Sequence, residues 1–108
     1  MIGQRIYKST FEAGHFIEGH PKCGTQHGHS YHLNVYVTAD LDEWQDFADL
    51  KRDVDNHVQT KYDHQFLGNM SAEELASKIA KHLVSIGYGG HLELYETDKF
   101  GIWVRFGR

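Results

Sequence analysis

The segment from His27 to Val37 alternates strictly between two faces. The odd positions carry two histidines followed by apolar or aromatic residues: His27, His29, Tyr31, Leu33, Val35 and Val37. The even positions are small or polar, apart from one tyrosine: Gly28, Ser30, His32, Asn34 and Tyr36. Successive side chains of a strand point to opposite faces, so this alternation predicts a strand with one buried face. The paired histidines continue that apolar face and lie at its end, pointing inward.

A third histidine, His15, ends another predicted strand at residues 3–16. It can join His27 and His29 because antiparallel neighbours lie only about 5 Å apart. Three neutral imidazoles that leave a fourth position open are the ligand set of a catalytic zinc site. The alternative for a single histidine on a strand is a surface or hydrogen-bonded core position. We assign that role to five of the other six histidines, at positions 20, 32, 57, 82 and 91.

The single cysteine, Cys23, comes four residues before His27. It would lie beside the metal or bind it. A lone cysteine is more often a small buried hydrophobe. Here the polar surroundings and a nearby divalent cation favour a thiolate.

The remaining elements predict an α+β fold. Asp46 is a candidate N-cap for a helix to about Gln59, with Phe47, Leu50, Val54 and Val58 on its apolar side. Ser71 and Glu74 form a capping box before a second helix that Gly87 stops, with a stripe of Leu75, Ile79, Leu83 and Ile86. Strands at 91–97 and 101–107 close the chain. The order ββααββ predicts an antiparallel sheet with two helices on one face.

Two further features carry candidate chemistry. Glu96 shares a strand face with Leu92 and Leu94. Either the strand end leaves its carboxylate in water, or the carboxylate meets a cation or strong donors. Asp63 precedes His64, and an aspartate can set the tautomer of a histidine and raise its basicity, although adjacent side chains often point apart.

Composition limits the class of protein. At 108 residues, 40% hydrophobic and 24% charged, the chain is expected to form one domain over residues 1–108. One cysteine and no apolar leader or long apolar run favour a cytoplasmic protein without a membrane segment. The net charge of −4 argues against nucleic acid as a partner, and the acidic stretch 40–55 is expected to be a solvated helix face.

These motifs together resemble the 6-pyruvoyltetrahydropterin synthase / 6-carboxytetrahydropterin synthase family over nearly the whole chain. The resemblance rests on residues 11–15, 23–30, 46–51, 63–67, 71–73 and 96–97, in that order. It implies the tunnelling fold (T-fold), in which ββααββ subunits form a barrel, and a homo-hexamer of two trimers with active sites between subunits. It also implies zinc on His15, His27 and His29, a catalytic Cys23, and an acid/base pair at Asp63 and His64. Glu96 would anchor the guanidine-like edge of the pterin, which would explain a carboxylate in line with leucines.

The resemblance also implies a reaction. A cysteine separated by three residues from His-Gly-His is similar to the carboxy-forming type, which converts 7,8-dihydroneopterin triphosphate to 6-carboxytetrahydropterin on the way to queuosine and other deazapurines. The alternatives are 6-pyruvoyltetrahydropterin synthesis, dihydroneopterin side-chain cleavage, or a non-catalytic zinc-stabilised module with Cys23 as fourth ligand. The chain departs from the family at residues 67–73, where a loop at the triphosphate end of the pocket is shortened.

Overall fold

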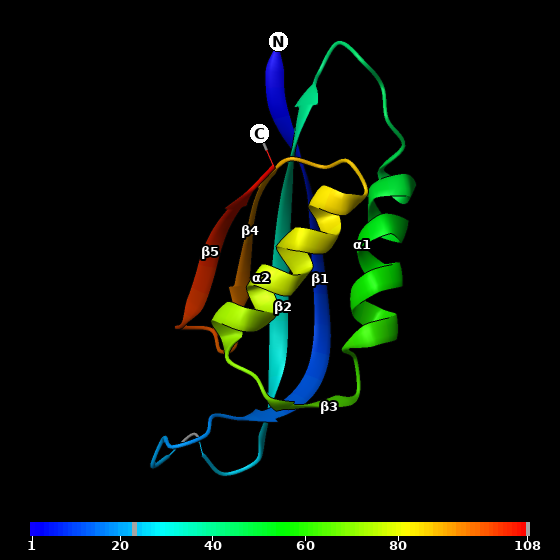
Figure 1. Ribbon diagram of the computed structural model, residues 1–108. Coiled ribbons are helices and arrows are strands. Elements are labelled where there is room, and N and C mark those ends of the chain that lie inside the picture. The colour runs from blue at the N-terminus through cyan, green and yellow to red at the C-terminus, as the bar shows by residue number, and fades with distance from the viewer. Residues whose placement is uncertain (23, 108) are drawn as a thin grey trace.

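The computed structural model describes residues 1–22 and 24–107. In this part of the chain five strands form one sheet, and two helices pack on one of its faces (Figure 1). The predicted α+β class with both helices on one side of the sheet is confirmed. Neither of these helices is long and apolar enough to cross a membrane.

The two longest strands form a hairpin at the centre of the sheet. Strand β1 spans Ile2–Phe16 and strand β2 spans His27–Asp40, and they pair antiparallel along their whole length. The predicted alternation in β2 is confirmed, because the following side chains on its inner face are buried: Tyr31, Leu33, Val35 and Val37. The inner face of β2 therefore belongs to the hydrophobic core.

Helix α1 spans Phe47–Lys61 and begins where the sequence predicted. Asp46 caps it, since its Oδ1 accepts a hydrogen bond of 2.9 Å from the Ala48 amide. The buried stripe consists of Leu50, Val54 and Val58. The prediction that Phe47 belongs to this stripe is wrong. Phe47 lies in the first turn, is 69% exposed and lines a surface groove with Ile6 and Trp44.

Helix α2 spans Ala72–Ser85, and Ser71 caps it by accepting a hydrogen bond of 3.1 Å from the Glu74 amide. Three of the predicted stripe residues are buried: Leu75, Ile79 and Leu83. The prediction that Ile86 belongs to the stripe is wrong, because Ile86 follows the last helical residue and is 44% exposed. Gly87 then adopts a φ of +100°, a conformation that favours glycine and ends the helix.

Strand β4 (Gly90–Tyr95) pairs antiparallel with β2, and strand β5 (Gly101–Phe106) pairs antiparallel with β4. The sequence did not predict strand β3 (Gln65–Asn69), which runs parallel to β1 at the other edge. Its five residues show no alternation, and Gly68 has a φ of +74°. Pairing with β1 therefore makes this segment a strand. The order is β3-β1-β2-β4-β5, so the sheet is mostly rather than wholly antiparallel.

The acidic stretch 40–55 is not only a solvated face, because Asp55 fixes α1 to β1. Its carboxylate accepts hydrogen bonds from the Tyr7 hydroxyl at 2.6 Å, the Ser9 hydroxyl at 2.8 Å and the Lys51 ammonium at 2.9 Å. Burial alone would raise the pKa of Asp55, but these donors outweigh it and hold the pKa below its usual value. The anchored strand β1 carries His15 near its far end.

Candidate metal centre and active site

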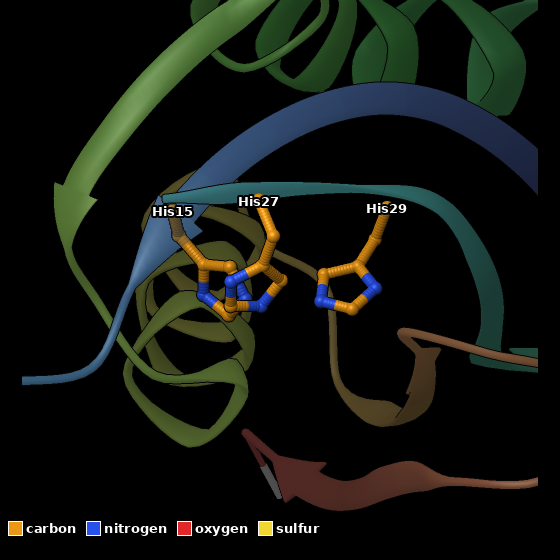
Figure 2. A group of neighbouring side chains, drawn as sticks. All are labelled: His15, His27 and His29. Atoms are coloured by element: carbon orange, nitrogen blue, oxygen red, sulfur yellow. The ribbon is translucent and has the colours of Figure 1, made fainter. Parts of the chain in front are cut away.

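Three histidines meet at the end of the β1–β2 hairpin, on the face that carries the helices (Figure 2). His15 pairs with His27 across the two strands, and His29 lies two residues further along β2. The ring centroids are 4.5 Å apart for His15 and His27, 4.8 Å for His27 and His29, and 4.9 Å for His15 and His29. One ring nitrogen from each lies within 4.8 Å of the others. The three side chains could therefore hold one metal ion.

Backbone carbonyls fix the orientation of two of these rings. The Nδ1 of His15 lies 2.6 Å from the Met70 carbonyl oxygen, and the Nδ1 of His27 lies 2.7 Å from the Thr25 carbonyl oxygen. A carbonyl only accepts, so each Nδ1 carries the proton and each Nε2 keeps a free electron pair. This is the usual second interaction of a metal-binding histidine, because it sets the tautomer and the direction of the ring.

Two ring nitrogens of this cluster are buried. His15 is 1% exposed, and the Nε2 atoms of His15 and His29 have no hydrogen-bond partner among the described residues. Burial lowers the pKa of His29, although Glu96 acts in the opposite direction. Two buried, unpartnered ring nitrogens beside a third imidazole fit a transition-metal ion with a position left open.

The structure places Glu96 beside the histidines. It follows the last residue of β4, its side chain is 25% exposed, and its Oε1 lies 3.4 Å from His15 Nε2 and 3.9 Å from His29 Nε2. Glu96 is therefore neither fully in water nor enclosed by the leucines of its strand face, because it lies beside two imidazole nitrogens. A pterin anchor and a metal neighbour are different roles for this carboxylate.

Asp63 and His64 form a separate unit clamped to β1. The Asp63 carboxylate accepts a hydrogen bond of 2.9 Å from the Glu12 amide, and the His64 amide donates one of 2.6 Å to the Glu12 carbonyl. The Glu12 amide holds the pKa of Asp63 below its usual value, and the His64 contact lowers it further. Asp63 Oδ2 lies 2.8 Å from His64 Nδ1, so an ionised Asp63 can orient the ring. His64 has a φ of +57°, a strained value that occurs often at functional sites.

His64 and His29 line the same surface depression, of about 410 Å³. Gly14 and Gly28 pair across the strands at this point and leave its floor without side chains. Within residues 1–22 and 24–107, no hydrogen bond or ion pair joins His64 to the three histidines. His64 is 79% exposed, so its ring is available to a group outside this chain's own core.

Two sequence predictions at this end of the sheet have different outcomes. Cys23 lies outside the described residues, so its place beside the metal stays a prediction. The shortened segment 67–73, by contrast, contains the end of β3 and places the Met70 carbonyl against His15. The short connection thus contributes directly to the orientation of a candidate ligand.

Sequence reasoning missed Tyr31 as part of the site. It lies two residues after His29 on the same face, and its ring centroid is 5.6 Å from that of His29 and 6.3 Å from that of His15. Burial raises the pKa of Tyr31, and the charge of Glu96 adds to the effect. The strand alternation placed this residue on the histidine face, but it also matched a plain core position.

The comparisons with known proteins agree on one family. A family model described as 6-pyruvoyl tetrahydropterin synthase matches residues 5–104. A protein of Archaeoglobus fulgidus with the provisional name 6-carboxy-5,6,7,8-tetrahydropterin synthase is 36% identical over 86 residues, which cover 73% of this chain and 74% of that protein. A protein of Synechocystis sp. named 6-carboxy-5,6,7,8-tetrahydropterin synthase is 33% identical over 110 residues, which cover 85% of each chain.

The fold is similar to that of a solved structure. The Caenorhabditis elegans 6-pyruvoyl tetrahydropterin synthase superposes with a TM-score of 0.86 at 20% sequence identity, covering 99% of this chain and 97% of that chain. At this identity the similarity shows a shared fold and does not distinguish one reaction from another.

Proposed function

Because the chain belongs to the 6-pyruvoyl tetrahydropterin synthase family, we propose that it is a zinc-dependent 6-carboxy-5,6,7,8-tetrahydropterin synthase. Its substrate would be 7,8-dihydroneopterin triphosphate, and the reaction would release acetaldehyde and triphosphate. The observation that carries the proposal is the cluster of His15, His27 and His29, with buried electron pairs at the end of the sheet. The names of its relatives support the carboxy-forming reaction.

The donor set supports zinc as the metal. Three imidazoles with an open position are the arrangement of catalytic zinc sites, and the carbonyl of Met70 or Thr25 behind a ring is the usual orienting partner. Zinc bound there would act as a Lewis acid on the side-chain hydroxyls of the substrate. The chain itself would supply the proton transfers and the binding of the pterin ring.

Proton transfer is assigned to Cys23 and His64. The Cys23 thiolate would remove a carbon-bound proton of the substrate, and His64 would shuttle another. Asp63, which is 2.8 Å from His64 Nδ1, would keep the outer nitrogen of that ring free to accept a proton. Glu96 would accept hydrogen bonds from the guanidine-like edge of the pterin.

Assembly into a homo-oligomer is part of the proposal. In the described part of the chain, β5 pairs on one side only, and β1 meets β3 only near its end, at Ala13, Gly14 and Phe16. Unpaired strand edges invite pairing with another chain, and closing a barrel removes them. We expect a hexamer of two trimers in which the exposed His64 serves a site shared between subunits. Light scattering should then give a mass near 75 kDa, six times the 12.5 kDa of one chain; a stable, active monomer would contradict it.

Product analysis tests the reaction. The zinc-loaded protein should convert 7,8-dihydroneopterin triphosphate to 6-carboxytetrahydropterin, with acetaldehyde detected by mass spectrometry. A 6-pyruvoyl product, or cleavage of the side chain of dihydroneopterin, would assign the chain to the alternative reaction of the same family. No turnover at full zinc occupancy would contradict catalysis altogether.

A further inference from the structure

The position of Glu96 points to a second role for this carboxylate. Its Oε1 lies 3.4 Å from the Nε2 of His15 and 3.9 Å from the Nε2 of His29. Neighbouring ligand atoms on a tetrahedral ion with bonds of about 2.0–2.2 Å are themselves roughly 3.3–3.5 Å apart. The first separation matches that value, and the second exceeds it by a few tenths of an ångström. The carboxylate is therefore within reach of an ion held by His15 and His29.

The tautomer of His15 strengthens this assignment. Its proton lies on Nδ1, where the Met70 carbonyl accepts it at 2.6 Å. In the neutral ring, the Nε2 electron pair faces a carboxylate oxygen, and both atoms are donors of electron pairs. Two such atoms repel unless a cation lies between them.

Glu96 cannot lie against the histidines and anchor the pterin ring at the same time. In the proposed function, the metal holds the substrate side chain while Glu96 holds the opposite edge of the pterin ring. The ring system would then lie between Glu96 and the metal. In the structure, Glu96 instead lies directly against two of the candidate ligands. The carboxylate needs two positions to perform both tasks.

The segment around Glu96 allows such a movement. Glu96 lies just beyond the last pairing residue of β4, where its amide donates to the Phe100 carbonyl at 3.1 Å. This hydrogen bond holds the backbone of the turn, while the side chain, 25% exposed, reaches both the histidines and the solvent. Rotation about the side-chain bonds is sufficient to move the carboxylate.

We propose that Glu96 is the fourth metal ligand in the substrate-free protein, and that an incoming pterin displaces it and then binds it through the guanidine-like edge. The proposal rests on the proposed function, since it assigns a resting state to the same site. Its consequence is that the open coordination position appears only when substrate is present to occupy it. Adventitious anions are thus excluded from the metal between turnovers.

The test uses the cobalt-substituted protein, because Co²⁺ reports its ligands through its visible spectrum. Three variants are compared with the parent chain: Glu96→Gln, Asp98→Asn and His29→Ala. Asp98 is the matched control, since it is an exposed acid in the same turn and its substitution removes the same charge. The measurements are cobalt affinity by competition with a chelator, spectral response to azide, and binding of 7,8-dihydroneopterin.

Glu96→Gln should bind cobalt about 10–100-fold more weakly, a loss at least as large as that for an outer-shell partner. Azide should change the cobalt spectrum of Glu96→Gln at a concentration about tenfold lower, or less, than the parent protein requires, since the loss of a ligand is worth at least as much as the loss of an outer-shell partner. The same variant should bind 7,8-dihydroneopterin about 10–100-fold more weakly, because it loses a charge-assisted pair of hydrogen bonds. Asp98→Asn should match the parent in all three measurements.

A Glu96→Gln protein with the parent's cobalt affinity and azide response would overturn the inference. If His29→Ala still loses cobalt in that experiment, the proposed function stands and Glu96 acts only as the pterin anchor. Retention of cobalt by His29→Ala would instead contradict the metal site, and with it the proposed function. The two failures are thus distinguishable on the same set of proteins.

Discussion

Two clusters of histidine rings lie in the described part of the chain, and their geometries differ. At the end of the hairpin, His15, His27 and His29 meet edge to face, with interplanar angles of 62°, 72° and 89°. Between the two helices, His57 and His82 stack face to face, with centroids 3.8 Å apart and an interplanar angle of 4°. Both clusters contain a buried Nε2 without a hydrogen-bond partner among the described residues.

Ring orientation, rather than residue type, separates the two clusters. In the hairpin cluster the carbonyls of Thr25 and Met70 hold Nδ1 atoms from behind, which aims Nε2 atoms toward a common point. In the stacked pair, His57 and His82 contact each other through their faces. Ring nitrogens then lie side by side rather than converging, so a stack contributes packing instead of a metal site. The following experiments test this distinction.

The largest expected effect is loss of the metal from the hairpin cluster alone. His29→Ala, like His27→Ala, should weaken zinc binding by more than about 100-fold, because even outer-shell partners are worth 10–100-fold, and should abolish turnover. His82→Ala removes a histidine of the stacked pair and should keep zinc at one ion per subunit. Zinc content by mass spectrometry and product formation are the measurements. If His29→Ala kept one zinc ion per subunit and the parent's turnover rate, the hairpin cluster would not be the metal site, and the proposed difference between the two clusters would be wrong.

The next effect separates catalysis from metal binding within the hairpin cluster. Cys23→Ala should lower turnover by about 10²–10⁴-fold, the usual contribution of a general base, and should leave zinc bound, since three histidines suffice. Zinc stoichiometry, thermal stability and turnover are measured on this one variant. Release of zinc together with unfolding would show that Cys23 is a structural ligand, as the zinc-stabilised module requires.

The stacked pair should appear instead in the dependence of stability on pH. Burial, with the charges of His82 and Lys61 adding to it, lowers the pKa of His57 to about 4 from 6.5. The unfolded chain therefore binds a proton more readily than the fold, so stability is complete above pH 6.5 and declines as the pH falls toward 4. The loss should be on the order of 1–2 kcal/mol, reduced by partial exposure of the ring.

Urea unfolding at pH 7 and pH 4.5 measures this loss. The control is His57→Phe, which keeps a flat ring against His82 and removes the titrating group, while the rest of the chain is the same in both proteins. The difference in stability between the two pH values should shrink in the variant. An unchanged difference would mean that another group is responsible.

The smallest effects concern one buried tyrosine beside each cluster. The hydroxyls of Tyr31, near His29, and of Tyr62, near His57, have no hydrogen-bond partner among the described residues. Removal of an unpaired buried hydroxyl should leave stability unchanged or raise it by up to about 1 kcal/mol. Chemical denaturation of Tyr31→Phe and Tyr62→Phe tests this expectation. A clear loss of stability in either variant would reveal a hydrogen bond that forms in solution.

Local pattern and tertiary contact account for different parts of the predictions. The caps at Asp46 and Ser71 and the buried face of β2 followed from the sequence, because caps and alternation depend on neighbouring residues. Strand β3 did not, because only its pairing with β1 defines it. Phe47 and Ile86 have the spacing of buried residues but lie at helix ends, where the spacing does not decide what covers a side chain.

The same division holds for the candidate site. The sequence by itself determined that His27 and His29 share a strand face, since that follows from the period of a strand, and that His15 could join them. Only the tertiary structure decided which nitrogen of His15 is free, because the Met70 carbonyl that sets its tautomer is 55 residues away in the chain. It likewise decided that Glu96 lies against the histidines, through the pairing of β4 with β2. Periodicity fixes the direction of a side chain relative to its own strand, whereas the partner that it meets depends on how distant segments pack.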